Sequence, residues 1–131
     1  MHIGMVVRHF SSSSIGAVQR CAYELARRLK RDGEECTIYT NGAEQKSYTF
    51  RGIEVVQLNP SRFFEQAARR TEDLDVCHFH GSTAGCVRFV RHAHKKPVLT
   101  IYDAQPRLGE LLNLRLSHLL EGRMLKVPSY W

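Results

Sequence analysis

The sequence predicts an α/β domain with a doubly wound, mostly parallel sheet and helices on both faces. Three features favour this fold. Short apolar runs are typical of buried strands, the segments between them repeat apolar residues at helical spacing, and Gly, Ser or Asn marks most junctions. At 131 residues, with 43% hydrophobic and 24% charged side chains, the chain has the size and composition of one globular domain, residues 1–131.

The first forty residues predict a βαβ unit, in which a helix connects two parallel strands. Residues 2–7 are a predicted apolar strand, and residues 11–16, four serines followed by Ile-Gly, are a predicted turn. Apolar side chains then recur on one stripe over residues 18–29, which predicts a helix that Ser14 caps and an Asp-Gly pair ends. Residues 36–40 favour a second strand.

The remainder of the chain continues the alternation. The expected elements are strands 47–50 and 53–58, a short helix around 63–68, strand 76–79, helix 83–94 and strand 97–102. The leucine-rich segment 108–126 predicts a last helix with a broad apolar stripe. If that stripe does not pack on the sheet, it exposes a patch that requires a partner, so we expect self-association or a second chain at residues 108–126.

Composition narrows the cellular setting. No apolar run approaches the roughly 20 residues that cross a bilayer, and no signal-peptide pattern is present, so we expect a cytoplasmic protein, peripheral to a membrane at most. The four cysteines lack metal-binding spacing and lie in apolar surroundings, which favours buried free thiols.

Basic residues outnumber acidic ones by 19 to 13, for a net charge of +6, and the excess is concentrated in residues 1–31 and 81–96. Such segments attract phosphate on a nucleotide, a nucleic acid or an anionic membrane surface, or they are solvated helix faces. We do not expect nucleic acid, because the chain has no RNA-recognition or helix-turn-helix signature and no set of stacking aromatic residues.

Ligands of open parallel sheets bind beyond the carboxyl ends of the strands, where loops lead into helix N-termini. The loop 11–17 fits this pattern, because Gly16 lets a ligand approach the backbone and the helix N-terminus that follows favours an anion such as phosphate. The loop is neither a P-loop nor a GxGxxG dinucleotide motif. Alternatively, the loop is an ordinary strand-to-helix turn, since such turns are often rich in Gly and Ser.

A second loop, residues 80–85, follows strand 76–79. His78 and His80 point to the same side of that strand, but no third ligand has convincing spacing, so we expect no metal. We expect His78 to be enclosed and His80 to reach the crevice beside Gly81. There it can donate to a sugar hydroxyl or a phosphate oxygen, or transfer a proton near neutral pH.

A third strand end supplies Tyr102 and Asp103 to the same crevice. Both side chains can bind hydroxyl groups of a ligand. Alternatively, Asp103 caps the turn that follows it.

Four blocks together resemble the N-terminal half of a family-4 glycosyltransferase with the GT-B fold. The blocks after the opening strand are SSSSIGAVQR, AYELARRLKRDGEECTIYT, DVCHFHGSTAG and KPVLTIYDAQP, so the resemblance extends from Met1 to about Pro106. Any one block is poor support, whereas their order and spacing make the resemblance specific.

The resemblance implies a Rossmann-like domain that faces a second one across a cleft. It implies a nucleoside-diphosphate sugar as co-substrate, a glycan or lipid-linked acceptor, and no other cofactor. His80 corresponds to the histidine that touches the transferred sugar, and Gly16 with Ala17 to the loop near the diphosphate. The expected donor- or acceptor-binding residues are Ser14, Gly16, Ala17, Arg20, Gly81, Ser82, Tyr102 and Asp103.

The sequence departs from the family pattern in two places and in length. Ile15 stands where relatives often have a second glycine, and Tyr102 where they often have a histidine. Nothing resembles the donor-binding C-terminal domain, so we expect these 131 residues alone to be inactive or nearly so, and to act with a second chain or a missing domain. The alternative is a non-catalytic module that kept the fold and binds a glycan, a membrane surface or a partner.

Overall fold

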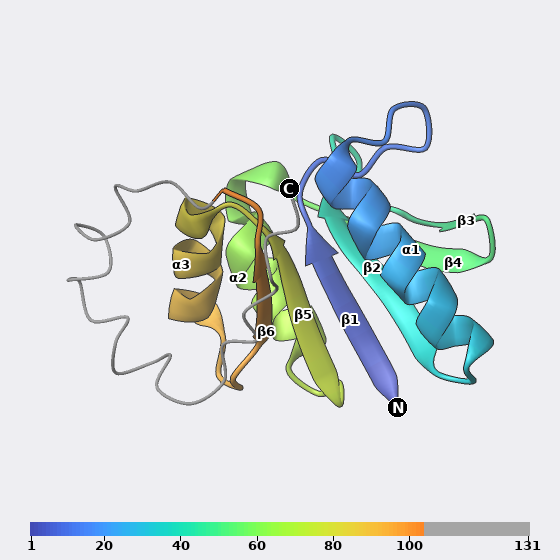
Figure 1. Ribbon diagram of the computed structural model, residues 1–131. Helices are drawn as coiled ribbons and strands as arrows, with labels where there is room; N and C mark the ends of the chain where they lie inside the picture. The colour runs from blue at the N-terminus through green and yellow to red at the C-terminus, as the bar shows by residue number, and fades with distance from the viewer. Residues whose placement is uncertain (104–131) are drawn as a thin grey trace.

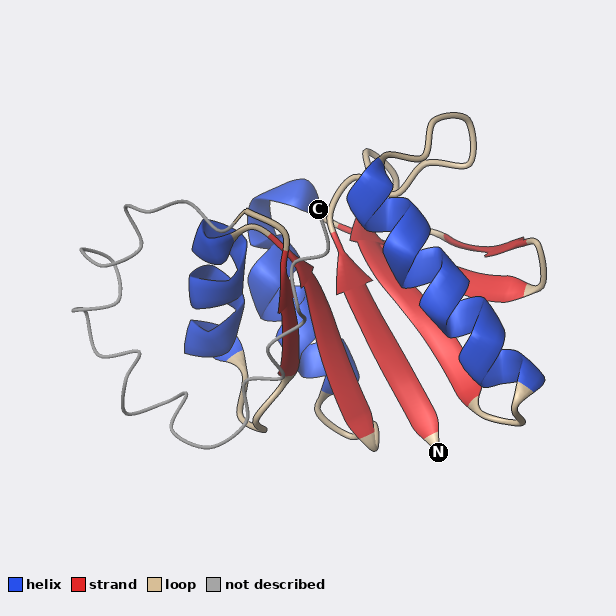
Figure 2. Cartoon of the chain, in the orientation of Figure 1, coloured by secondary structure: helices blue, strands red, loops and turns tan. Residues whose placement is uncertain are grey.

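The computed structural model describes residues 1–103 of the chain, which form one α/β unit (Figures 1 and 2). The elements are β1 (His2–Val7), α1 (Ala17–Arg31), β2 (Glu35–Asn41), β3 (Ser47–Phe50), β4 (Ile53–Leu58), the 3-10 turn η1 (Pro60–Arg62), α2 (Phe63–Thr71), β5 (Val76–Gly81), α3 (Thr83–His92) and β6 (Val98–Ile101).

The six strands form a single sheet in the order β3-β4-β2-β1-β5-β6. Neighbouring strands are parallel except in the β3–β4 hairpin, which is antiparallel. An α/β fold with a mostly parallel sheet is therefore confirmed.

Helices cover the sheet from two sides. In Figure 1, α1 lies in front of the sheet and α2 behind it, and α3 packs in the same apolar cluster as α2. Each side has its own apolar cluster. Because side chains alternate along a strand, the central strand β1 contributes Met5 and Val7 to the cluster beneath α1 and Val6 to the cluster beneath α2 and α3. All three of these side chains are fully buried, which explains the uninterrupted apolar run at the start of the sequence.

Helix α1 begins where the apolar stripe predicts, but its cap differs from the expected one. Gly16 is the N-cap, and no side chain caps the helix. Ser14 lies two positions earlier and is exposed, so the expected Ser14 cap is wrong. The predicted end is confirmed, because α1 stops at Asp32 and Gly33 follows with φ of +93°, a left-handed conformation that favours glycine.

Two further expectations need correction. Helix α3 ends at His92 rather than His94, because Ala93 has an extended backbone (φ −77°, ψ 127°). The four cysteines are free thiols, but Cys21 is exposed on α1 rather than buried. The expected leucine-rich helix at 108–126 lies outside the described residues. Within residues 1–103, no helix is both long enough and apolar enough to cross a bilayer.

Candidate functional site at the carboxyl ends of the strands

Two of the predicted loops meet at one rim of the sheet because β1 and β5 are parallel neighbours. Val7, the last residue of β1, pairs in register with His80 near the end of β5. An open hollow of about 200 Å³ lies beside these strand ends, and we call it the rim hollow. Its lining residues are Val7, Arg8, His9, Val18, Gln19, Phe79, His80, Gly81, Ser82 and Gly85.

His80 lines the rim hollow with a ring that is buried but only half hydrogen-bonded. The residue is 3% exposed, and its Nδ1 lies 2.9 Å from the hydroxyl oxygen of Tyr102. Its Nε2 has no hydrogen-bond partner among the described residues. Because buried polar atoms are nearly always satisfied in folded proteins, this nitrogen beside the hollow is a candidate contact for a polar ligand.

The environment of His80 and His78 reverses the expected division between them. His80 is the more buried of the two, whereas His78 is half-buried and its Nε2 lies 2.7 Å from the hydroxyl oxygen of Thr100. The expected degrees of burial are therefore reversed, although His80 does lie at the hollow and His78 is hydrogen-bonded within the domain. Alternation along β5 fixes the common side of the two rings, but Tyr102 of a later segment decides which is covered.

Burial keeps both histidines neutral near pH 7. The pKa of His80 is lowered to about 3, first by burial and then by the charge of nearby His78. Burial alone lowers the pKa of His78 to about 4. His80 therefore offers a neutral hydrogen-bonding nitrogen, and the expectation that it transfers protons near neutral pH is not met by this environment.

Tyr102 and Asp103 are placed near the rim but turn toward neighbouring residues of the protein. The Tyr102 hydroxyl is engaged with His80. The Asp103 carboxylate accepts from the backbone N–H of Thr83 at 2.7 Å and from its hydroxyl at 3.2 Å. Asp103 thus caps the first turn of α3, and neither residue lines the hollow. The turn after Asp103, which was its alternative role, lies outside the described residues.

Gly81 and Ser82, which were expected to bind donor or acceptor, line the hollow. Each of them also stabilises the local structure. Ser82 is the N-cap of α3, and its hydroxyl accepts from the Gly85 backbone N–H at 3.1 Å. A Cβ at Gly81 would lie 2.8 Å from Cε1 of Phe79, which is closer than packed carbons approach. Glycine at this position therefore lets the Phe79 ring pack against the backbone of β5.

The serine-glycine loop before α1 contributes less directly than expected. The hollow is lined instead by Val18 and Gln19, in the first turn of the helix. Because α1 has no side-chain cap, its first N–H groups have no side-chain acceptor in the described part of the chain. The expected binding residues that do not line the hollow are Ser14, Gly16, Ala17 and Arg20.

The most informative lining residue missed from the sequence is Arg8. Its guanidinium carbon lies 5.5 Å from the centroid of the Phe64 ring, and its buried Nε has no partner among residues 1–103. Its carbonyl accepts from the Gln19 side chain at 2.8 Å, which joins the end of β1 to α1. An arginine directly after a buried strand is the signal that could have identified it.

His9, beside Arg8, has a left-handed backbone with φ of 60°, which is uncommon for a residue other than glycine. The end of β2 holds it there. The His9 backbone N–H donates to the Asn41 side chain at 2.8 Å, and the Phe10 N–H donates to the Thr40 hydroxyl at 2.9 Å. The β1 side of the hollow is therefore fixed by two side chains from the neighbouring strand.

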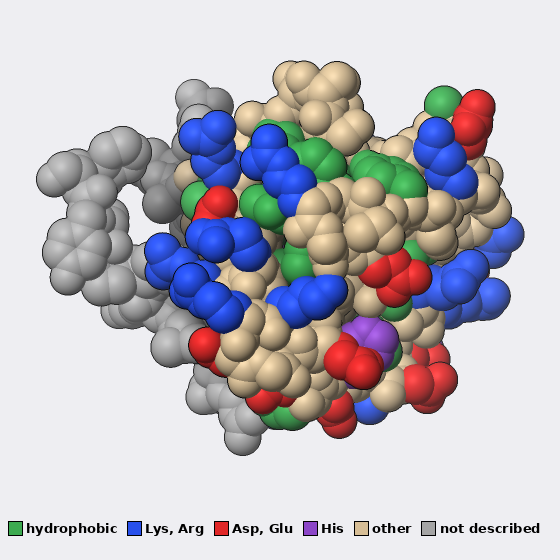
Figure 3. Space-filling view, turned by 90° about the vertical axis from the view of Figure 1, so that its right-hand side faces the viewer, with side chains coloured by type: hydrophobic (Ala, Val, Ile, Leu, Met, Phe, Trp, Pro, Cys, Tyr) green, Lys and Arg blue, Asp and Glu red, His purple; other side chains and the backbone are tan. Residues whose placement is uncertain are grey.

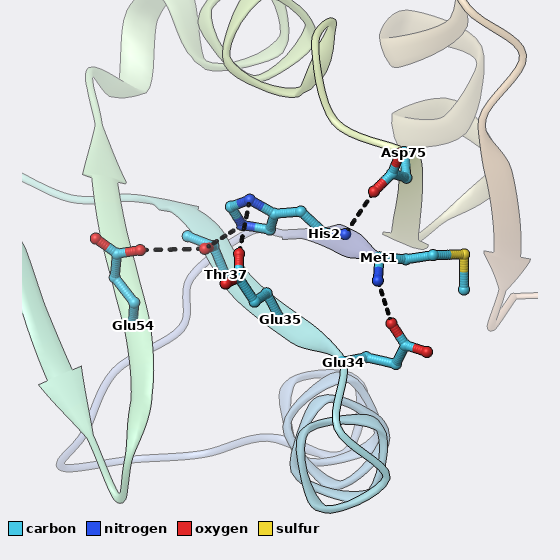
Figure 4. Close-up of polar contacts among 7 residues, drawn as sticks. All are labelled: Met1, His2, Glu34, Glu35, Thr37, Glu54 and Asp75. Carbon is cyan, nitrogen blue, oxygen red and sulfur yellow. Dashed lines mark hydrogen bonds and ion pairs between the residues drawn. The ribbon is translucent and has the colours of Figure 1, made fainter.

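A separate polar network lies at the opposite rim, at the amino ends of the strands (Figure 4). The Thr37 hydroxyl donates to the Glu54 carboxylate at 3.1 Å and lies 3.0 Å from Nε2 of His2. Since a hydroxyl has one proton, His2 Nε2 is the donor to Thr37. The His2 backbone also donates to the Asp75 carboxylate at 2.7 Å. This network joins β1, β2 and β4 and is remote from the rim hollow.

Neither a metal-binding group nor a similar protein identifies the ligand of the rim hollow. Within the described part of the chain, no three His, Cys, Asp or Glu side chains are grouped to hold a metal ion. No family model, curated protein or solved structure matches the chain. The function is therefore argued from the geometry of the rim hollow.

The rim hollow is suited to binding oxygen-rich ligands. Arg8 supplies a buried N–H donor, His80 a nitrogen that donates or accepts according to its tautomer, and α1 an uncapped N-terminus. The Ser82 hydroxyl is occupied as a helix cap, and His80 lies beside Tyr102 rather than a nucleophile. The arrangement favours recognition of hydroxyl or phosphate oxygens over covalent catalysis.

Proposed function

We propose that the chain is the acceptor-side domain of a glycosyltransferase that uses a nucleoside-diphosphate sugar. In this proposal the sheet is doubly wound and forms one half of a GT-B fold, and a second domain supplies the main donor site across a cleft. The proposal is motivated by the four sequence blocks that resemble this family. The rim hollow lies where an open parallel sheet binds its ligands.

One observation carries the proposal. Arg8 and His80 come from different strand ends, both line the rim hollow, and each has a buried side-chain nitrogen without a partner among residues 1–103. Phosphate and sugar oxygens accept hydrogen bonds from Arg8, and a sugar hydroxyl can either donate to His80 or accept from it. In this proposal a sugar phosphate in the hollow contacts both residues.

The proposed roles follow from the charges of these groups. His80 contacts the transferred sugar as a neutral ring, because its pKa is lowered to about 3 by burial and by His78. The uncapped N-terminus of α1 and Arg8 face the diphosphate. Transfer depends on positioning and charge stabilisation from both walls of a cleft, so this domain alone is expected to bind without turnover.

A non-catalytic binding module is the second candidate, and internal hydrogen bonds favour it. Ser82, Tyr102 and Asp103, which were expected to contact substrate, are engaged with Gly85, His80 and Thr83. A module of this kind would use the fold to bind a glycan, an anionic membrane surface or a partner protein.

Titration calorimetry on the 131-residue chain distinguishes the two. The ligands are uridine and guanosine diphosphates and their glucose and mannose conjugates, tested against the parent chain and against Arg8→Gln, His80→Phe and Gly16→Glu. Arg28→Gln, on the exposed face of α1, is the control with the same change of charge as Arg8→Gln.

The glycosyltransferase proposal expects nucleotide-sugar binding that the three site variants weaken and Arg28→Gln leaves unchanged. The absence of binding, together with capture by vesicles that contain phosphatidylglycerol, would support the module instead. Equal weakening by Arg8→Gln and Arg28→Gln would contradict a role for the rim hollow, because only bulk charge would then matter.

A further inference from the structure

A second hollow lies at the β3–β4 edge of the sheet, on the side that α2 covers. We call it the edge pocket. Its volume is about 490 Å³, against about 200 Å³ for the rim hollow. The lining residues come from the segment before β3, the end of β4 and the exposed side of α2, and they are Gln45, Lys46, Ser47, Val56, Gln57, Leu58, Gln66, Arg69 and Arg70.

The edge pocket is independent of the rim hollow. The two share no lining residue, and the sheet order places β2 and β1 between β4 and β5. A ligand in the edge pocket therefore does not compete with one at His80.

The chemistry of the lining is one-sided. It holds three cationic side chains, three carboxamides, one hydroxyl and two apolar side chains, and it holds no carboxylate. Cations and amide N–H groups are hydrogen-bond donors that match the oxygens of phosphate or sulfate groups. A neutral or cationic ligand would add no negative charge to this cationic lining.

The nearest acids do not neutralise these cations fully. Lys46 lies 3.4 Å from the Glu44 carboxylate, and Arg69 lies 3.4 Å from Glu65. Glu65, however, is closer to Arg62, at 2.8 Å. Arg70 has no ion pair with any residue from 1 to 103, so its guanidinium is open to a ligand.

Part of the pocket is already organised in the free protein. The Gln66 carbonyl oxygen accepts from the Asn59 backbone N–H at 3.1 Å, which leaves its NH₂ group as the free end. The Gln57 backbone N–H donates to the Lys46 carbonyl at 2.8 Å and fixes the segment before β3 against β4. Fixed donors bind an anion with less loss of side-chain entropy than free ones.

The charge on this side of the molecule is grouped rather than continuous. The view onto the β3–β4 edge shows Lys and Arg side chains in separate groups, with acidic side chains between and below them (Figure 3). A local pocket with no acid in its lining is therefore distinct from a basic surface that attracts anions everywhere.

We propose that the edge pocket binds a phosphorylated small molecule, with Lys46, Arg69 and Arg70 holding the phosphate. Gln66 donates to a remaining oxygen, and Val56 contacts the organic part, for which the volume leaves room beyond one phosphate group. The phosphate can belong to a soluble metabolite or to a lipid headgroup, since both offer the same oxygens.

The experiment is a titration of the ¹⁵N-labelled 131-residue chain with sodium pyrophosphate at constant ionic strength, followed by amide NMR. Saturable shifts are expected in the segments 45–47, 56–58 and 66–70. Arg70→Gln and Lys46→Gln should each weaken binding about tenfold, as loss of one charge-assisted hydrogen bond predicts. Arg28→Gln, with the same charge change on exposed α1, should leave it unchanged.

Shifts without saturation, or equal weakening by Arg28→Gln and Arg70→Gln, would overturn the proposal, as would the absence of shifts at the edge pocket. His80→Gln should leave the pyrophosphate-induced shifts in segments 45–47, 56–58 and 66–70 unchanged, because the two hollows share no lining residue. This test and that of the rim hollow therefore fail separately. A parallel arm with phosphatidylinositol-phosphate vesicles identifies the source. Vesicle capture that pyrophosphate competes away indicates a headgroup, and pyrophosphate binding without capture indicates a soluble ligand.

Discussion

The imidazole rings of His78 and His80 stack on one another in the sheet, with centroids 3.9 Å apart and planes 28° from parallel. Two rings at this distance cannot both carry a proton without strong repulsion. Each ring also lies in a buried setting that lowers its pKa, to about 4 for His78 and to about 3 for His80. The stacked pair is thus neutral in the folded protein over a wide range of pH.

The first prediction concerns acid stability. An unfolded histidine has a pKa near 6.5 and binds a proton that the folded pair excludes, so the unfolded state gains protons first as pH falls. The free energy of unfolding should therefore fall between about pH 6.5 and pH 4, by up to about 1.4 kcal/mol per pH unit for each histidine. Urea unfolding at pH 7 and pH 5 measures the difference.

The control for that measurement is His94→Gln, which removes an exposed histidine outside the stacked pair. His78→Gln and His80→Gln should each reduce the loss of stability between pH 7 and pH 5. An identical loss in all three variants and in the parent chain would assign the acid sensitivity to other groups.

The second prediction tests the hydrogen bond between Tyr102 and His80, which is 2.9 Å long. Tyr102→Phe keeps the ring but leaves the Nδ1 of the buried His80 without its partner. The free energy of unfolding should fall by about 1–3 kcal/mol. Tyr48→Phe is the matched control, because no hydrogen bond to its hydroxyl is present within residues 1–103. If Tyr102→Phe and Tyr48→Phe lower the free energy of unfolding equally in chemical denaturation, the hydrogen bond between Tyr102 and His80 does not stabilise the fold.

The third prediction concerns Gly81, where an added Cβ would lie 2.8 Å from Cε1 of Phe79. Phe79 is buried and stacks on Phe89 with centroids 5.0 Å apart, so its ring has little room to move. Gly81→Ala should destabilise the fold by about 1–3 kcal/mol. If the clash is the cause, Gly81→Ala should cost less in a Phe79→Leu background, and a strictly additive double variant would contradict it.

The fourth prediction compares two serines. Ser82 caps α3 through the Gly85 N–H, whereas Ser14 makes no cap contact with α1, whose N-cap is Gly16. Ser82→Ala should lower the free energy of unfolding by about 1 kcal/mol, and Ser14→Ala should leave that free energy nearly unchanged. If Ser14→Ala lowers the free energy of unfolding more than Ser82→Ala in calorimetric melting, Ser14 caps α1 as the sequence predicted.

Regular elements could be predicted from the sequence because their signals are local. The period of α1 and the apolar run of β1 each lie within about fifteen residues. The Ser14 cap failed because several adjacent serines offer equivalent caps, and only the backbone path selects Gly16. Local patterns contain no information of that kind.

The candidate site was less predictable because its contacts join distant segments. Arg8 packs against Phe64, and Asp103 caps the helix that begins at Thr83. Alternation along a strand could place the His80 side chain on one side of β5, but it could not show that Tyr102 covers the ring. The position of the site at the strand ends was predictable, whereas the burial and pairing within it were not.

The central position of β1 has a consequence for synthesis of the protein. One side of β1 pairs with β2, and the other side pairs with β5. The backbone of Ile3 can therefore pair with Val76 only after β5 has been synthesised. On the ribosome, β1, β2, β4 and β3 can assemble from the first 58 residues, while the β5 side of β1 remains an open backbone edge next to unfilled apolar surface. A pause in translation between the synthesis of β4 and that of β5 would leave this edge exposed to aggregation. The open edge of β1 is also the surface that a chaperone would bind.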